Sequence, residues 1–163
     1  MTLPGSARQQ FLAAAALCVG VVGAALYTQH ALGMLPCPWC VLQRLIFVVI
    51  GMTALVGAAL SGNGKSGSRL AAAGVMLLGA GAGMAAALWQ HFVSASSTSC
   101  KLTLADRIMS ATGLDAWLPD VFAAWASCAD GAVKLLGLLY EAWSLLTFAL
   151  LAGLAVTLMR LRG

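Results

Sequence analysis

Two cysteines separated by a two-residue spacer are the residues of this chain best suited to chemistry. They are Cys37 and Cys40, in the run Cys-Pro-Trp-Cys, and Arg44 follows four residues after the second cysteine. A bond across so short a spacer closes almost no loop, so it would stabilise the fold little, whereas adjacent thiols make a good redox couple. We therefore expect Cys37 and Cys40 to be catalytic and to alternate between dithiol and disulfide.

The residues around this motif indicate the beginning of a helix. Pro36 and Pro38 flank Cys37, and a long apolar run follows Cys40. Proline is tolerated in the first turn of a helix, where its missing N–H has no partner to lose. The N-terminal end of a helix also favours the thiolate, which is the reactive form of cysteine. The motif should therefore precede or begin a helix that enters the membrane.

A second pair of cysteines lies much later, in a polar segment. Cys100 and Cys128 are predicted to share one side of the membrane with Cys37 and Cys40, and disulfides persist in oxidising compartments. Three pairings of these four cysteines exist, and the short spacing favours Cys37 with Cys40. The functional hypothesis pairs Cys100 with Cys128 and makes exchange between the pairs the reaction. One alternative is that both disulfides only stabilise the fold, and another is that the four cysteines bind a structural zinc ion. Cys100 and Cys128 lack the short spacing typical of zinc ligands, so no metal is expected.

Composition predicts an all-α membrane protein. Of the 163 residues, 61% are hydrophobic and 9% are charged, whereas soluble proteins average about 25% charged. Four apolar stretches approach the roughly 20 residues that cross a bilayer, and backbone groups in lipid must bond within a helix. We predict one domain, 1–163, that forms a four-transmembrane-helix bundle with a long periplasmic loop between helices 3 and 4. The spans are about 11–27, 41–60, 70–88 and 142–159; the outer loops are 28–40 and 89–141, and the inner loop is 61–69.

The distribution of charge predicts the orientation. Basic residues without any acid occupy the N-terminus, the 61–69 loop and the C-terminus, whereas all five acids fall in 89–141. The positive-inside rule therefore places both termini in the cytoplasm. The net charge of +4 is then a topology signal, and no nucleic-acid partner is expected. The basic residues are Arg8, Lys65, Arg69, Arg160 and Arg162.

A redox-active dithiol needs an electron acceptor. Arg44 lies one helical turn after Cys40, so both should face one side of the helix. A charge at the edge of a span suggests a functional site, although Arg44 could instead be a snorkelling anchor. His91 follows the third span at the same membrane level and could donate a hydrogen bond or a proton to a reduced carrier, or be an ordinary interface histidine. Gln43 could bind the same ligand or orient Arg44, and His30 is expected in a loop. With no flavin or haem signature, a lipid-soluble quinone is the natural acceptor.

Three further expectations concern two amphipathic pieces, the cysteine of the first span and the chain before Cys100. The pieces Leu102–Ser110 and Leu114–Trp125 are predicted to lie on the bilayer surface. Cys18, inside the first span, is predicted to be a small apolar core residue. Before Cys100 the chain holds only small or polar residues from 94 to 99, so we expect Cys100 to reach the groove of a soluble partner.

Taken together, the motifs resemble those of the DsbB family of disulfide bond formation proteins over nearly the whole chain. The spacer Pro-Trp differs from the more familiar spacers of that family. The runner-up is a quinone-linked enzyme of the vitamin K epoxide reductase kind, which usually carries its cysteine motif late in the bundle; a third hypothesis is a non-enzymatic scaffold with stapled loops. The matching segments are Cys37-Pro-Trp-Cys40-Val-Leu-Gln43-Arg44, Gln90-His91, Cys100, Trp117-Leu-Pro-Asp-Val-Phe122, Ser127-Cys128-Ala129, and Glu141 with Trp143-Ser-Leu145.

The resemblance implies a specific electron path in the bacterial inner membrane. The pair Cys100–Cys128 would oxidise a DsbA-like periplasmic protein of thioredoxin fold. Cys37 would exchange with Cys128, and Cys40 would face the quinone, either ubiquinone or menaquinone. Arg44 and His91 would lie beside that quinone.

Overall fold

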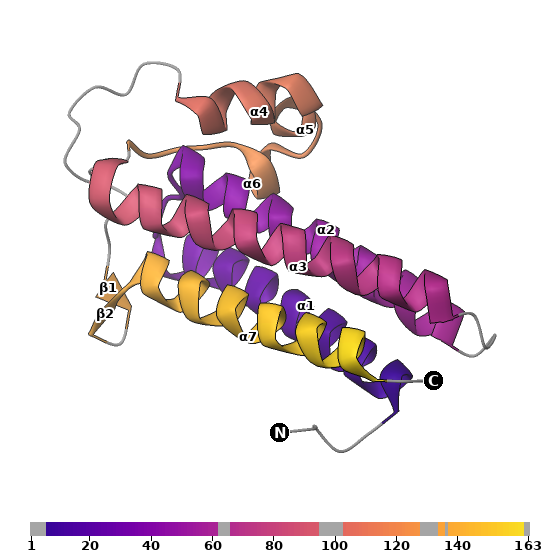
Figure 1. The fold of residues 1–163 in the computed structure, drawn as a ribbon. Coiled ribbons are helices and arrows are strands. Elements are labelled where there is room, and N and C mark those ends of the chain that lie inside the picture. The colour runs from indigo at the N-terminus through magenta and orange to yellow at the C-terminus, as the bar shows by residue number, and fades with distance from the viewer. Residues whose placement is uncertain (1–5, 62–65, 95–102, 128–133, 136, 162–163) are drawn as a thin grey trace.

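Four long helices form the body of the molecule in the computed structural model. They are α1 (Ala7–Leu32), α2 (Pro38–Leu60), α3 (Ser66–Trp89) and α7 (Tyr140–Arg160) (Figure 1). Each is long and apolar enough to cross a membrane, which confirms the predicted all-α, four-span architecture. The structure describes residues 6–61, 66–94, 103–127, 134–135 and 137–161.

The helices extend beyond the predicted apolar spans. α1 continues to Leu32 and ends at Gly33, whose φ of 65° lies in the left-handed region that glycine adopts without strain. His30 therefore lies in the last turn of α1, and its prediction as a loop residue was wrong. Hydropathy marks only the part of a helix that lies in lipid, whereas backbone hydrogen bonding continues into the polar turns.

α2 lies between α1 and α3, and α3 in turn packs along α7. Phe47 of α2 stacks on Phe148 of α7, with ring centroids 4.0 Å apart. A Cβ added to Gly83 would lie 2.3 Å from the Phe148 ring, so only glycine lets α3 approach this closely. Small residues allow this kind of close helix packing in membranes.

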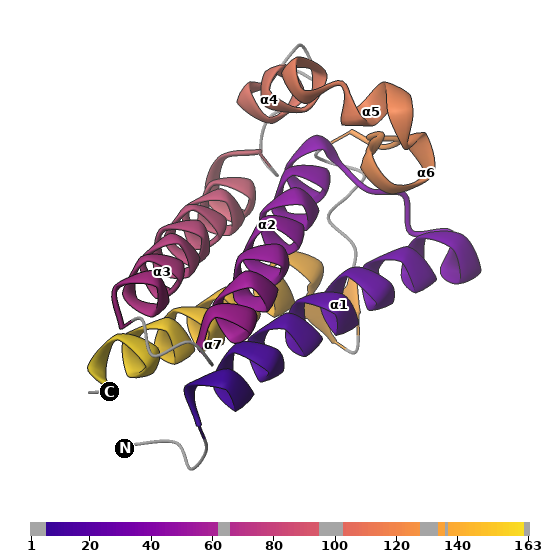
Figure 2. The same cartoon turned by 90° about the vertical axis from the view of Figure 1, so that its right-hand side faces the viewer.

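A second layer crosses one end of the bundle. It consists of α4 (Leu104–Thr112), α5 (Leu114–Trp117) and α6 (Pro119–Phe122). Figure 2 shows this layer at the end opposite the start of α1 and the end of α7. The second predicted amphipathic piece is divided at Leu118, because Pro119 begins a new helical turn. The remaining elements are the π-helix η2 (Gln90–Ser94), which continues α3, and the short antiparallel pair β1 (Lys134–Leu135) and β2 (Leu138–Leu139).

Candidate active site

The start of α2 positions the two cysteines of the motif. Cys37 is the N-cap and Pro38 the first helical residue, so the motif begins the helix as predicted. The Sγ of Cys37 accepts a hydrogen bond from the backbone N–H of Cys40 at 3.3 Å. The two sulfurs lie 2.7 Å apart, longer than a disulfide bond of about 2.05 Å. This pair is hydrogen-bonded, and its sulfurs are close enough to join on oxidation.

The two cysteines have different surroundings although only two residues separate them. The Cys37 side chain is fully buried in an apolar cluster that includes Trp39 of α2, Met109 of α4 and Phe122 of α6. Cys40 is partly buried and lines a cavity. Both cysteines thus contact the apolar cluster, but of the two only Cys40 also lines the cavity.

The cavity beside Cys40 has a volume of about 40 Å³. Its walls come from α1, the connection after α1, α2 and the start of α7. Polar groups gather near Cys40, and apolar side chains form the rest. The lining residues are Val21, Val22, Ala25, Thr28, Met34, Leu35, Pro36, Cys40, Gln43, Arg44, Phe47, Tyr140 and Ser144.

Arg44 lines this cavity together with Cys40, as their four-residue spacing predicts. Only 5% of Arg44 is exposed, so it does not snorkel to the membrane surface. Its guanidinium donates hydrogen bonds to Gln29 Oε1 at 3.0 Å and to the Val121 carbonyl. Gln29 also donates to the carbonyl of Asp120 at 3.0 Å, which ties α6 to α1. Arg44 Nε is buried and has no partner among the described residues.

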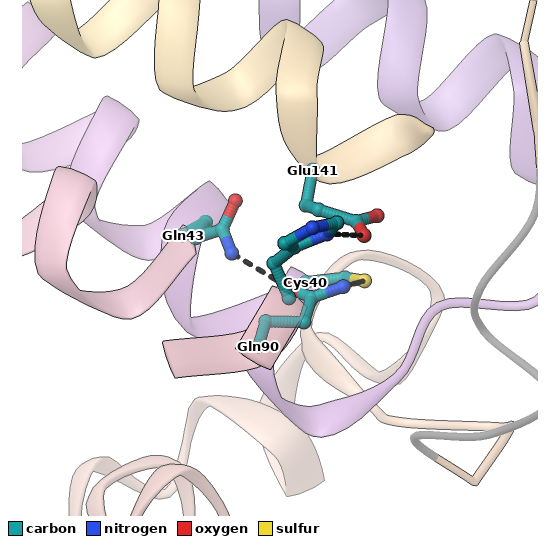
Figure 3. Close-up of polar contacts among 5 residues, drawn as sticks. Cys40, Gln43, Gln90 and Glu141 are labelled. Carbon is teal, nitrogen blue, oxygen red and sulfur yellow. Dashed lines mark hydrogen bonds and ion pairs between the residues drawn. The ribbon is translucent and has the colours of Figure 1, made fainter. Parts of the chain in front are cut away.

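A pair of buried glutamines reaches the sulfur of Cys40. Gln90 Nε2 donates to Cys40 Sγ at 3.4 Å, and Gln43 Nε2 donates to Gln90 Oε1 at 2.7 Å. The three side chains lie together in Figure 3. Gln43 is hydrogen-bonded to Gln90, whereas Gln29 accepts a hydrogen bond from Arg44 and orients its guanidinium. Gln90 was not predicted as a site residue; the available signal was an amide at the end of an apolar span.

His91 lies outside the cavity lining and pairs with an acid. Its Nδ1 is 3.1 Å from Glu141 Oε1, while 44% of the histidine side chain is exposed. Glu141 is buried, and its second oxygen has no hydrogen-bond partner in the described part of the chain. Glu141 points from α7 toward Cys40 and Gln90 (Figure 3). Glu141 belongs to a segment that carries the family resemblance but was not predicted as a site residue, although an acid at the edge of a span is a signal of function.

The loop cysteines, Cys100 and Cys128, lie outside the described residues. The chain that leads to Cys128 is nevertheless anchored beside the motif. The backbone N–H groups of Trp125 and Ala126 donate to the carbonyl of Pro36 at 3.0 and 3.2 Å. Pro36 directly precedes Cys37, so the segment that ends just before Cys128 is hydrogen-bonded next to the buried sulfur.

Known proteins resemble this chain along almost its full length. The family described as "Disulfide bond formation protein DsbB" matches residues 7–158. Disulfide bond formation protein B of Aromatoleum aromaticum is 39% identical over 161 residues, which cover 97% of this chain and 96% of the relative. Disulfide bond formation protein B 1 of Pseudomonas aeruginosa is 37% identical over 153 residues, 93% of each chain. The chain therefore belongs to the DsbB family and is a membrane thiol:disulfide oxidoreductase of quinone-linked disulfide bond formation.

Proposed function

We propose that this protein reoxidises a DsbA-like periplasmic dithiol protein and passes the electrons through two cysteine pairs to membrane quinone. The protein would lie in the bacterial inner membrane with both termini in the cytoplasm. The observation that carries the proposal is that Cys40 and Arg44 line one cavity at the start of α2. A reactive sulfur and a permanent cation thus line the same space, and the cation would favour negative charge on a quinone that takes electrons from the sulfur.

The electrons balance over three exchanges. The partner dithiol becomes a disulfide and gives two electrons and two protons to the Cys100–Cys128 disulfide. The resulting dithiol reduces the Cys37–Cys40 disulfide in the same way through a mixed disulfide. The quinone supplies the final oxidising capacity, since it takes two electrons and two protons and leaves as quinol. The net reaction oxidises one dithiol and reduces one quinone.

The geometry favours a different role for each cysteine of the motif. Attack by the Cys128 thiolate on Cys37 releases Cys40 as a thiolate into the cavity. The anchoring of Trp125 and Ala126 on Pro36 supports Cys37 as the sulfur that is attacked. The amide of Gln90 donates to Cys40 Sγ and stabilises its negative charge.

Gln43 fixes the orientation of the Gln90 amide. Because Gln43 donates to Gln90 Oε1, the nitrogen of Gln90 is the end that faces Cys40. The two glutamines thus form a short chain of donors that ends at the reactive sulfur. In this arrangement Gln43 acts through Gln90 while it also contributes to the cavity wall.

The cavity residues suit the head of a quinone such as ubiquinone or menaquinone. Arg44 Nε is a buried donor without a partner in the described residues, and a guanidinium favours negative charge on a ring oxygen. A volume of about 40 Å³ holds only a few waters, whereas ligand pockets measure about 300–1,000 Å³. Binding of a ring therefore requires side chains to move, and Leu35, half of which is exposed, is placed to do so.

His91 and Glu141 are proposed to supply a proton near this site. The ring of His91 is held by its hydrogen bond with the buried side chain of Glu141. His91 would thus act on the quinone by proton transfer, although it does not line the cavity.

Oxidation of a reduced thioredoxin-fold dithiol protein by the purified protein, with quinone as the acceptor, tests the proposed function. One mole of quinol should form for each mole of dithiol oxidised. Turnover of an epoxide in place of a dithiol protein would favour an enzyme of the vitamin K epoxide reductase kind, and no turnover at all would favour a scaffold. A periplasmic reporter signal from a fusion at Gly163 would contradict the orientation.

The entry point for the partner is tested separately. Replacement of Cys128 by Ser, with a partner that lacks its own resolving cysteine, leaves one thiol of each to react. With quinone present to take up the two electrons and two protons through Cys37 and Cys40, a mixed disulfide should accumulate at Cys100. Mass spectrometry identifies the linked cysteine. A linkage to Cys37 or Cys40 would mean that the partner bypasses the loop pair.

A further inference from the structure

A buried glutamine near the end of α1 connects two elements that carry different parts of the site. Only 7% of Gln29 is exposed. Its Oε1 accepts a hydrogen bond from Arg44 Nη1 at 3.0 Å, and its Nε2 donates to the carbonyl of Asp120 at 3.0 Å. The amide thus contacts α2 with one end and α6 with the other. A flipped amide would place donor against donor and acceptor against acceptor, so the two partners fix one orientation of this side chain.

The helix α6 is too short to pair its own carbonyl groups. The last four carbonyls of any helix have no partner within it, and α6 has only four residues. The carbonyls of Asp120 and Val121 accept hydrogen bonds from Gln29 and Arg44 instead. Side chains of α1 and α2 therefore supply the partners that α6 lacks, and they hold it against the bundle.

The chain from α6 onward is docked beside the cysteine motif. α6 lies next to the start of α2 (Figures 1 and 2). Phe122 is buried in the apolar cluster around Cys37, and the backbone N–H groups three and four residues later donate to the carbonyl of Pro36. Residues 119–126, here named the docked segment, are thus held at one end by α1 and α2 side chains and at the other by Pro36. This segment leads toward Cys128.

The arginine that holds the docked segment also belongs to the cavity. Arg44 lines the cavity beside Cys40, while its Nη1 is bonded to Gln29 and to the carbonyl of Val121. With the segment docked, these acceptors hold the guanidinium in one orientation, so a quinone oxygen meets a donor group that is already ordered. If the segment leaves, Arg44 loses one acceptor and the Gln29 amide loses one of its two partners. The guanidinium then has more orientations available to it.

We propose that Gln29 is a positioning residue that couples quinone binding at Arg44 to docking of residues 119–126 beside Cys37, an inference that rests on the proposed function. Each event favours the other, and linkage requires the two effects to be equal in size. Because few hydrogen bonds carry the coupling, we expect a factor of about five, at the low end of the usual range. The chain that leads to Cys128 would therefore dock most firmly when an electron acceptor occupies the cavity.

Hydrogen exchange of the wild-type protein in nanodiscs tests the coupling without any variant. The protein is freed of endogenous quinone and fully oxidised, so that added short-tailed ubiquinone is not consumed. Saturating quinone should slow exchange of the amides of Trp125 and Ala126 about fivefold, because local opening becomes rarer. A protein that binds and reduces quinone without this slowing would overturn the coupling alone. A protein that neither binds nor reduces quinone would overturn the proposed function, and this inference with it.

Substitutions of Gln29 test its part in the coupling. In Gln29→Leu saturating quinone should slow exchange of the same amides less than twofold. Gln29→Glu keeps an acceptor for Arg44 but loses the donor to the carbonyl of Asp120, so it should lose the coupling as well. The matched control is Gln10→Leu, since Gln10 is a buried glutamine of the same helix that accepts a hydrogen bond from Thr157 of α7. Full coupling in either Gln29 variant, or its loss in the Gln10 variant, would overturn the assignment to Gln29.

The reverse direction of the coupling is tested from the docked segment. Phe122 packs in the cluster around Cys37 and does not line the cavity, so Phe122→Ala weakens docking without touching the quinone site. The Kd of the oxidised protein for short-tailed ubiquinone should rise about two- to fivefold. In a Gln29→Leu background the same substitution should cause no further rise, because the connection is already broken. An unchanged Kd in Phe122→Ala, or an equal rise in both backgrounds, would overturn the proposal.

Discussion

Cys37 and Cys40 belong to one turn of α2, yet they face two different environments. Cys37 is enclosed by apolar side chains of α2, α4 and α6, and its neighbour Pro36 accepts two backbone hydrogen bonds from the chain that leads to Cys128. Cys40 faces a cavity with a buried arginine and accepts a hydrogen bond from Gln90. The difference indicates that one sulfur is placed for exchange with another cysteine and the other for delivery of electrons. The predictions below test this division.

Removal of Cys40 should have the largest effect. Cys40→Ser removes the thiolate that faces the cavity, so quinone reduction should fall at least about a thousandfold. The matched control is Cys18→Ala, because Cys18 is a buried thiol of α1 in the other apolar cluster. Its turnover should stay within about twofold of wild type. Steady-state quinol formation measures both, and substantial turnover by Cys40→Ser would show that Cys40 is not the electron donor.

Replacement of Arg44 should have the next largest effect. Arg44→Ala removes a buried cation at the cavity and should lower kcat/KM for quinone by about 10- to 100-fold. Arg44→Lys keeps the charge but loses the planar set of donors, so the loss should be smaller. His91→Ala should act in the same direction and more weakly, because His91 contacts Glu141 and does not line the cavity.

The control for Arg44 addresses its structural contacts. Arg44 also bonds Gln29 and the Val121 carbonyl, so a general loss of α6 docking would slow exchange with Cys128 as well. The rate at which the reduced loop pair reduces the Cys37–Cys40 disulfide separates the two effects. A deficit confined to that rate, with quinone kinetics unchanged, would return Arg44 to a purely structural role.

Gln90 should have a smaller effect that still distinguishes the two cysteines. Gln90→Leu removes a donor to the Cys40 thiolate, a bond worth about 1.5 kcal/mol to a charged group, or about tenfold in rate. Gln43→Leu should cost less, because Gln43 orients Gln90 and does not reach the sulfur. Alkylation rates of Cys40 and Cys37 measure the effect at each thiol. A larger change at Cys37 than at Cys40 would contradict the proposed role of Gln90.

Local patterns in the sequence were sufficient for the fold and for part of the site. Four apolar runs predicted four helices, and Pro38 in the first turn predicted that Cys37 begins α2. The spacing of Cys40 and Arg44 predicted a shared face because the i, i+4 relation is a property of any helix. These inferences concern residues within one helix, whose geometry is independent of the remaining chain.

Contacts between helices were beyond the reach of the same rules. Gln90 contacts Cys40, and His91 contacts Glu141, and in each pair the two residues are 50 positions apart in the sequence. Gln29, which orients Arg44, was not selected either. Each of these contacts depends on how α1, α3 and α7 rotate against α2, and hydropathy carries no information on that rotation. The roles proposed for Cys100 and Cys128 remain predictions, because both cysteines lie outside the described residues.

The most direct test of the division between the two cysteines is to identify which of them bonds to Cys128. In Cys40→Ser the Cys37 thiolate can attack the Cys100–Cys128 disulfide at Cys128 and release Cys100 as a thiolate. No Cys40 is present to resolve the product, so a mixed disulfide between Cys37 and Cys128 should accumulate and be found by mass spectrometry of proteolysed protein. In Cys37→Ser the corresponding bond between Cys40 and Cys128 should be scarce, because Cys40 faces the cavity beside Arg44. Equal accumulation of both species, or a predominance of the bond to Cys40, would contradict the account.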